Sequence, residues 1–213
     1  MRVPTTLPAA DLAGAEAVLS TTRAVRRRLD ADGPVDPGVL RQCLELAGQA
    51  PSAGDRQPLR WVVVTDKDTR AALGEIYRAA CASFDADRPP VSDETTRRLR
   101  AASTDLAIRM GSLPALVLAC TTEPAPTEAT GTVAARSWGS VLPAVWSLQQ
   151  ALRAYGLGSC PTTVRPARAD KFRALTKIPR EWTLAALLPV APITGDTLSP
   201  APRRELEEIV TWI

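Results

Sequence analysis

Three short stretches of this 213-residue chain carry polar and charged groups that the packing of a core does not require. They are residues 23–28, 51–57 and 156–164, and an arginine pair, Arg203-Arg204, lies near the C-terminus. The chain contains no histidine. Its absence excludes Ser-His-Asp and Cys-His nucleophile systems, histidine-ligated zinc, and histidine as a proton shuttle. We expect no metal site, and a reaction here must use carboxylates or a bound cofactor.

The first stretch is basic and has the spacing of an anion site. Arg23 and Arg26 are three residues apart, and Thr21 or Thr22 before them could cap a helix. Two guanidinium groups beside the free N–H groups of a helix start would bind a phosphate, each charge-assisted hydrogen bond contributing about 1.5–3 kcal/mol. A solvated basic face, or a weak nucleic-acid patch, has the same composition, so both alternatives stay open at this point.

The second and third stretches are loops with exposed backbone. Residues 51–57 lie between an expected helix and an expected strand, where Ser, Asp and Gln side chains could face a pocket and Gly54 permits close approach. An ordinary connector is the alternative. Residues 157–163 follow a glycine turn but match neither the dinucleotide-binding nor the P-loop glycine pattern. Cys160 within them suits a packed thiol better than a ligand contact.

The composition predicts a globular protein that resides in a reducing compartment. It is 45% hydrophobic and 23% charged, and no apolar run approaches the ~18 residues of a membrane span. The net charge of +3 is too small to imply a nucleic-acid partner. Four cysteines without a C-x-x-C pair, and Asp11 and Glu16 where a signal peptide would be apolar, predict a cytoplasmic location. We expect one domain over residues 1–213.

Apolar periodicity predicts helices separated by short strands. Apolar residues recur at helical spacing in six segments, namely residues 8–18, 37–50, 66–82, 99–110, 134–155 and 167–176. The longest, 134–155, is apolar on most sides, which indicates a central or dimer-interface helix. Three apolar runs without alternation, residues 61–65, 114–122 and 183–190, predict strands buried on both faces. Loops are expected at 85–92 and 123–132, and the class is α+β.

Taken in order, these motifs resemble those of the nitroreductase family. Arg23-Ala-Val-Arg26 is followed by Ala50-Pro-Ser-Ala-Gly-Asp-x-Gln-Pro58, Trp61-Val-Val-Val, Tyr155-Gly-Leu-Gly-Ser-Cys160 and the late arginine pair. The resemblance extends from about residue 20 to the C-terminus and is strongest to actinobacterial members. It implies a nitroreductase-like α+β fold, with a central, mostly antiparallel sheet flanked by helices. It also implies a homodimer that binds FMN in two active sites at the subunit interface.

The resemblance further implies a role for each stretch. Arg23, with Arg203 or Arg204, would bind the FMN phosphate, and Arg26 would lie nearer the ribityl chain and the pyrimidine edge. The loop at 51–57 would run along the ring, and backbone groups of 161–164 would face its N5 and O4 edge. The cofactor-binding residues expected in this way are Arg23, Ala24, Arg26, Pro51, Ser52, Ala53, Asp55, Gln57, Pro161, Thr162, Thr163, Arg203 and Arg204.

The function implied is that of an FMN-dependent oxidoreductase, with NADH or NADPH as reductant and ping-pong hydride transfer to nitroaromatics, quinones or similar flat acceptors. The missing histidine is consistent with this function, since a flavin accepts and returns hydride itself. Ala24, Asp55 and Leu59 stand where the family often has serine, asparagine and tryptophan. An ionised Asp55 would disfavour the anionic reduced flavin unless Arg56 or Arg60 pairs with it. A flavin-sequestering protein of the same fold with little turnover is the alternative, and we expect no nucleic-acid or membrane partner.

Overall fold

A four-stranded antiparallel sheet forms the centre of the molecule. The computed structural model describes residues 6–86, 89, 91–123, 131–164 and 166–213. The strands follow the order β1-β2-β4-β3, and each neighbouring pair is antiparallel. Their bounds are Leu59–Val64 for β1, Ala115–Thr121 for β2, Leu157–Ser159 for β3 and Thr183–Pro192 for β4.

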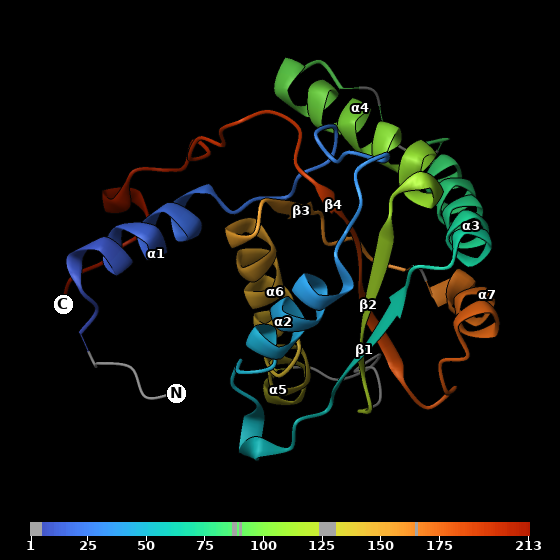
Figure 1. Ribbon diagram of the computed structural model, residues 1–213, viewed down its shortest axis with the longest axis horizontal. Coiled ribbons are helices and arrows are strands. Elements are labelled where there is room, and N and C mark those ends of the chain that lie inside the picture. Colours follow the sequence, from blue (N-terminus) through green and yellow to red (C-terminus); the bar gives the residue numbers. More distant parts are fainter. Residues whose placement is uncertain (1–5, 87–88, 90, 124–130, 165) are drawn as a thin grey trace.

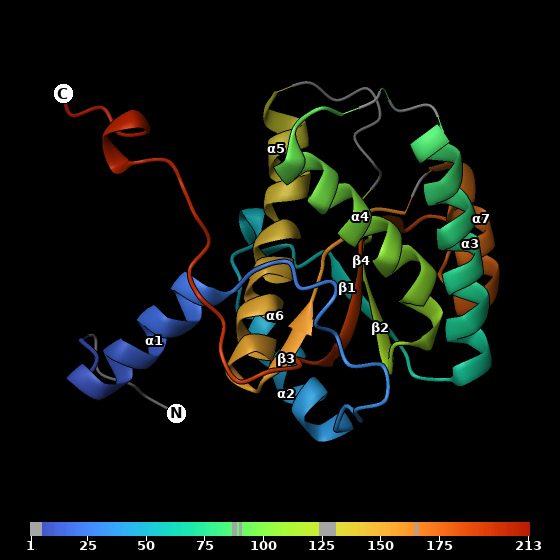
Figure 2. The same ribbon diagram turned by 90° about the horizontal axis from the view of Figure 1, so that it is seen from above.

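Helices cover both faces of this sheet (Figure 1). The helices α2 (Pro37–Ala47) and α6 (Leu142–Ala154) pack on one face. The opposite face is covered by α3 (Lys67–Ala86), α4 (Glu94–Arg109) and α7 (Pro166–Thr176). Two elements project from this body, α1 (Ala9–Thr21) and the segment after β4 with its 3₁₀ turn Leu206–Glu208 (Figure 2). Helix α5 (Thr132–Gly139) precedes α6.

The strand β2 divides two hydrophobic cores. Successive side chains of a strand point to opposite faces, so Leu116 and Leu118 enter the core under α3 and α4, while Val117 and Ala119 enter the core under α2 and α6. All residues of β2 are buried. The prediction of an apolar strand enclosed on both faces is therefore confirmed here, and the expected α+β class with an antiparallel sheet is confirmed as well.

Burial of β1 on both faces was predicted from the same kind of apolar run and is wrong. The strand is the outermost of the sheet, pairs only with β2 within the described chain, and leaves Val63 40% exposed. An edge strand has one neighbour instead of two and less cover from the helices. A run of β-branched residues does not distinguish these two environments.

The single helix expected over residues 134–155 is also wrong, because the chain forms α5 and α6 with a break at Ser140 and Val141. Pro143 occupies the first turn of α6. Proline lacks the N–H that a continuing helix needs, and its ring clashes with the carbonyl four residues earlier, so it suits a helix start. Ser140, placed at this break, becomes available to the loop at 51–57.

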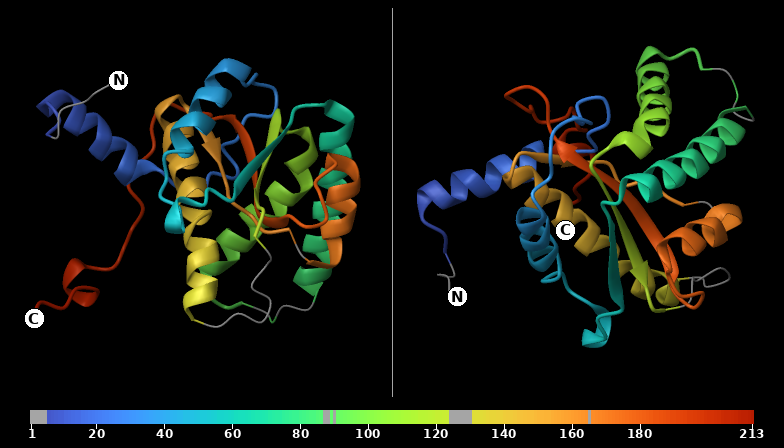
Figure 3. Two further views of the ribbon diagram at one scale, coloured as in Figure 1. Left: turned by 90° about the horizontal axis from the view of Figure 1, so that it is seen from below. Right: turned by 45° about the vertical axis from the view of Figure 1, so that its right-hand side comes forward.

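Two glycines allow α3 to cross the chain just after α4 at very short range. A Cβ atom added to Gly74 of α3 would lie 2.5 Å from the amide nitrogen of Gly111, in the 3₁₀ turn Met110–Ser112. Backbone atoms cannot give way as a flexible side chain can. The two glycines therefore set how closely α3 and α4 approach (Figure 3).

We expect Gly74→Ala to destabilise the protein by about 1–3 kcal/mol, because overpacking the crossing outweighs the better helix propensity of alanine. Urea unfolding measures the free energy. Gly14→Ala in α1 is the matched control, since a Cβ there meets nothing within 4 Å. Equal unfolding midpoints for Gly74→Ala and the parent protein would contradict the prediction.

Candidate functional site

The basic stretch at 23–28 follows the end of a helix and does not begin one. The hydroxyls of Thr21 and Thr22 donate to the carbonyls of Ala17 and Val18, four residues earlier in α1, both at 2.6 Å. The prediction that either threonine caps a new helix is therefore wrong. Both hydroxyls thus bond back to carbonyls within the helix that precedes them. The arginines act here without the free N–H groups of a helix start.

Hydrogen bonds from two other elements fix the backbone of this stretch. The amide of Val25 donates to the carbonyl of Ser159, the last residue of β3, at 2.9 Å. From α4, the guanidinium of Arg109 donates to the carbonyl of Arg26 at 2.9 Å and to that of Leu29 at 3.0 Å. An irregular segment thus acquires a defined conformation from both sides.

Two arginine side chains of the stretch hold the segment that follows β4. Arg28 donates to the carbonyls of Thr194 and Thr197 at 2.6 and 2.7 Å, and Arg23 donates to the carbonyl of Ser199 at 3.0 Å. Between the two segments lies a small pocket of about 160 Å³, lined by residues 23–28 and Leu198. Arg23, Ala24 and Arg26 share this pocket.

A second pocket of about 270 Å³ joins the first and third stretches. Arg26 lines it together with Pro161, Thr162 and Thr163, so the structure brings these predicted site residues together. The other lining residues are Tyr77, Ser103, Leu106 and Cys160. Of the described residues around the two pockets, none carries a carboxylate. Arg26 lines both pockets and makes their field positive.

The floor of this second pocket is anchored to the sheet. Thr162 and Leu187 exchange two backbone hydrogen bonds, both 2.8 Å, and the Thr162 hydroxyl donates to the Leu187 carbonyl at 3.0 Å. Tyr77 lines the pocket together with Thr162, and burial raises the pKa of its phenol, which keeps the hydroxyl protonated. Burial also raises the pKa of the Cys160 thiol, which supports a packed, neutral cysteine.

Sequence reasoning did not identify Tyr77, Ser103 or Arg109. They stand in α3 and α4 without any motif, and only the apolar periodicity that includes Leu106 pointed to a buried face there. Tyr77 and Ser103 line the pocket because the two helices cross closely, whereas Arg109 contacts the backbone of the basic stretch. No local pattern encodes that crossing.

The loop at 51–57 lies at the opposite end of the subunit from the basic stretch (Figure 1). Its 3₁₀ turn, Ala53–Asp55, is held by the Ser140 hydroxyl, which accepts from the Ala53 amide at 3.1 Å. The Ser52 hydroxyl accepts from the Gln57 amide at 2.9 Å. Pro51, Asp55 and Gln57 are exposed, whereas Ser52 and Ala53 are half-buried. The structure does not bring this loop to the two pockets.

Asp55 has a different partner from those expected. Its carboxylate accepts from the Gln57 amide group at 2.8 Å. Arg56 instead pairs with Glu123 at 2.9 Å, and Arg60 donates to the backbone carbonyls of Gln57 and Leu59. In the subunit, therefore, neither of the two arginines considered as partners pairs with Asp55, because both have partners elsewhere.

The late arginine pair also lies apart from the pockets. Arg203 donates to the carbonyl of its neighbour Pro202, and Arg204 is 4.0 Å from Glu208. Both are exposed, and neither is among the residues that line the pocket around Arg23. The projecting segment that carries them is the one Arg23 and Arg28 hold at its start (Figure 2).

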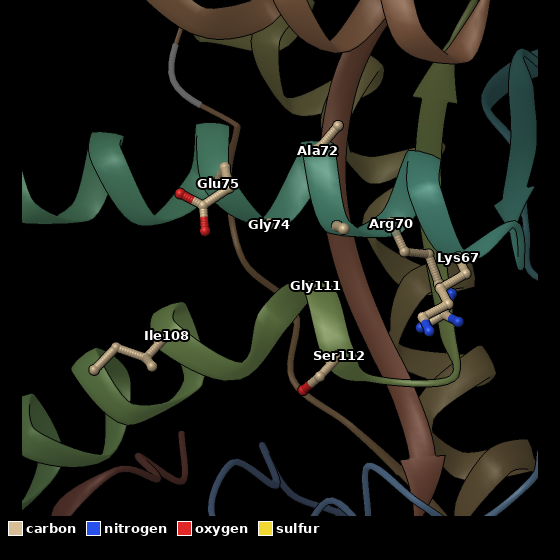
Figure 4. Close-up of a pocket in the computed structure, with 9 residues that line it drawn as sticks. Lys67, Arg70, Ala72, Gly74, Glu75, Ile108, Gly111 and Ser112 are labelled. Atoms are coloured by element: carbon tan, nitrogen blue, oxygen red, sulfur yellow. The ribbon is translucent and has the colours of Figure 1, made fainter.

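A larger hollow of about 530 Å³ lies between α3 and the 3₁₀ turn after α4 (Figure 4). It contains none of the predicted site residues. Two of its charged groups are engaged elsewhere, since Arg70 donates to the carbonyls of Thr65 and Leu113 and Glu75 pairs with Arg78. The chemistry of the site is therefore sought in the two pockets around Arg26.

Comparison with known proteins agrees with this geometry. The model of the nitroreductase family matches residues 19–191. The chain belongs to the nitroreductase family. A protein named NADH dehydrogenase from Thermus thermophilus is 31% identical to it, over 97% of this chain and 98% of that protein. The family predicted from the motifs is thereby confirmed.

Solved structures place the fold in the same family. An iodotyrosine deiodinase bound to FMN and 3-iodo-L-tyrosine is 27% identical, with a TM-score of 0.71 over 92% of this chain and 97% of that one. The FMN-dependent nitroreductase NfnB from Mycobacterium smegmatis, in complex with NADPH, is 23% identical, with a TM-score of 0.71 over 95% and 99%. The predicted nitroreductase-like fold is confirmed. Of the helices described here, none has the length and hydropathy needed to cross a membrane.

We expect Ser140→Ala to loosen the loop at 51–57, because the Ala53 amide loses its partner. Losing one hydrogen bond of this kind costs about 1 kcal/mol, which corresponds to about fivefold faster amide exchange in the loop. Hydrogen–deuterium exchange followed by mass spectrometry measures the change. Ser20→Ala, at an exposed serine of α1, is the control. Unchanged exchange in the loop would show that Ser140 does not hold it.

Proposed function

We propose that this nitroreductase-family protein binds FMN at a subunit interface and passes hydride from NADH or NADPH to a planar acceptor such as a nitroaromatic or a quinone. Family membership makes the protein an FMN-dependent oxidoreductase. The observation that carries the proposal is the shared pocket of Arg26 and residues 161–163. In this proposal residues 1–213 form one nitroreductase-like domain.

The residues around Arg26 suit a flavin mononucleotide. The pocket of residues 23–28 offers guanidinium groups without a carboxylate, which fits a phosphate. The adjoining pocket combines Arg26 with the anchored backbone of 161–163, which fits a heterocycle that both accepts and donates hydrogen bonds. In the proposal Arg23, with Ala24 beside it, contacts the phosphate, Arg26 the ribityl chain and pyrimidine edge, and residues 161–163 the N5 and O4 edge.

In this proposal the remaining predicted residues come from a second copy of the chain and from the projecting C-terminal segment. The loop at 51–57 and the basic stretch lie at opposite ends of one subunit (Figure 1), so a single chain cannot place both against one ring. In a homodimer the partner's loop would supply Pro51, Ser52, Ala53, Asp55 and Gln57 to the ring. Arg203 and Arg204, on the projecting segment, would join Arg23 at a phosphate.

The bound FMN would supply the chemistry by accepting hydride and returning it. Arg26 would place its positive charge at the pyrimidine edge, where negative charge develops, an electrostatic effect of about 3 kcal/mol in a partly buried site. The anchored backbone of Thr162 would orient the ring, and Tyr77 and Leu106 would exclude water from it. One pocket used in turn by reductant and acceptor gives ping-pong turnover. The buried thiols of Cys43, Cys120 and Cys160 support a cytoplasmic location, where thiols stay reduced.

The absorption spectrum tests the proposal directly. The purified protein should be yellow, should sediment as a dimer with FMN bound, and should bleach when NADH or NADPH is added without oxygen. Bleaching followed by steady turnover with a quinone supports an enzyme. Tight FMN that no pyridine nucleotide reduces would instead favour the flavin-sequestering alternative. A colourless protein that stays colourless with excess FMN refutes the cofactor site.

The phosphate assignment has its own test. We expect Arg23→Ala to weaken FMN binding about tenfold or more while riboflavin affinity changes little, because charge-assisted hydrogen bonds contribute about 1.5–3 kcal/mol each. Fluorescence titration measures both dissociation constants. Arg41→Ala, at an exposed arginine paired with Glu45, is the control. Equal losses for the two flavins would mean that Arg23 does not contact phosphate.

A further inference from the structure

Arg109 of α4 holds the backbone of the basic stretch through two hydrogen bonds, although no sequence motif indicates such a role. One guanidinium nitrogen donates to the Arg26 carbonyl at 2.9 Å and the other to the Leu29 carbonyl at 3.0 Å. The remaining nitrogen, Nε, pairs with Asp105 one turn earlier in α4, at 3.1 Å. All three nitrogens of the guanidinium are used, and the fork spans two carbonyls of one turn.

The helix that carries Arg109 also forms a wall of the pocket. Ser103 and Leu106 of α4 line the pocket of about 270 Å³ together with Arg26. Helix α4 therefore lines the pocket and also carries Arg109, which holds the backbone of Arg26. Because Arg109 and Leu106 are three residues apart, they share one face of α4. Any movement of α4 relative to Arg26 must break or stretch the bonds of Arg109.

We propose that Arg109 is a positioning residue that fixes the Arg26 guanidinium against the flavin pocket. The inference rests on the proposed function, since Arg26 is there assigned to the flavin. Arg109 touches neither pocket and acts through the Arg26 backbone. A planar, five-donor fork is required, because a lysine ammonium in this position reaches one carbonyl at a time.

The first experiment uses the protein without flavin. We expect Arg109→Met to raise amide exchange in peptides covering residues 24–29 by about tenfold, the effect of losing about 1.4 kcal/mol of hydrogen bonding. Arg97→Met is the matched control, because Arg97 is an exposed arginine of the same helix that pairs with Glu94. Arg109→Lys should lie between Arg109→Met and the parent. Exchange in 24–29 that is the same in all variants overturns the proposal.

The second experiment separates positioning from general stability. In the FMN-loaded protein, Arg109→Met should lower the ratio of the affinity for reduced FMN to the affinity for oxidised FMN by roughly three- to tenfold. Arg26→Ala should lower this ratio by about the same factor, because the positive charge is lost from the pyrimidine edge whether the side chain is displaced or deleted. Midpoint potentials give this ratio. The double variant Arg26→Ala/Arg109→Met should match Arg26→Ala alone.

Each result has one meaning. Additive losses in the double variant overturn the positioning role, as does an unchanged potential in Arg109→Met. If Arg109→Met does not fold, amide exchange and the midpoint potential are measured on Arg109→Lys instead. A midpoint potential equal to that of the parent protein then overturns the proposal. If the parent protein binds no FMN, the proposed function fails, and the exchange experiment still decides whether Arg109 holds residues 24–29.

Discussion

The site depends on how an irregular backbone segment is held in place. Residues 23–29 belong to no helix or strand except for a bridge between Leu29 and Ile193, so their conformation must come from outside. The sheet supplies one bond through Ser159, and α4 supplies two through Arg109. Leu29, only 1% exposed, anchors the end of the segment in the core under α3 and α4. Rigid neighbours thus give a flexible segment the precision that ligand binding needs.

Charge distribution follows from the same arrangement. Arg23 and Arg28 donate hydrogen bonds to carbonyls of the C-terminal segment. The backbone of Arg26 is held by Arg109, and Arg26 lines both pockets. Carbonyl oxygens satisfy donors without cancelling a charge. The guanidinium groups therefore keep their positive field, which carboxylate partners would have removed. A site for an anionic ligand is best built in this way.

The sequence predicted what is local and missed what depends on neighbours. The apolar run that contains Leu116 to Cys120 was correctly predicted to form a strand enclosed on both faces. The strand β1 has a similar composition but lies at the edge of the sheet, and composition does not encode that position. The motifs identified Arg26 and residues 161–163, which do share a pocket. Tyr77 could not be predicted, because its place at the pocket depends on how α3 packs against α4, a close approach that Gly74 permits. Arg109 could not be predicted either, because its partners are backbone carbonyls of a distant segment.

The loop at 51–57, which the proposal assigns to the site of a second copy, holds an unusual backbone conformation within one subunit. Gly54, Asp55 and Gln57 have φ values of 63°, 50° and 49°, in the left-handed region that only glycine adopts freely. Hydrogen bonds within the loop and from Ser140 hold this conformation. Non-glycine residues in that region cost about 1 kcal/mol or more each, and proteins retain such strain mainly where a function uses it. An exposed connector has no such use, whereas in the proposed dimer this loop would have its shape ready to fit a flat ring before the two copies meet.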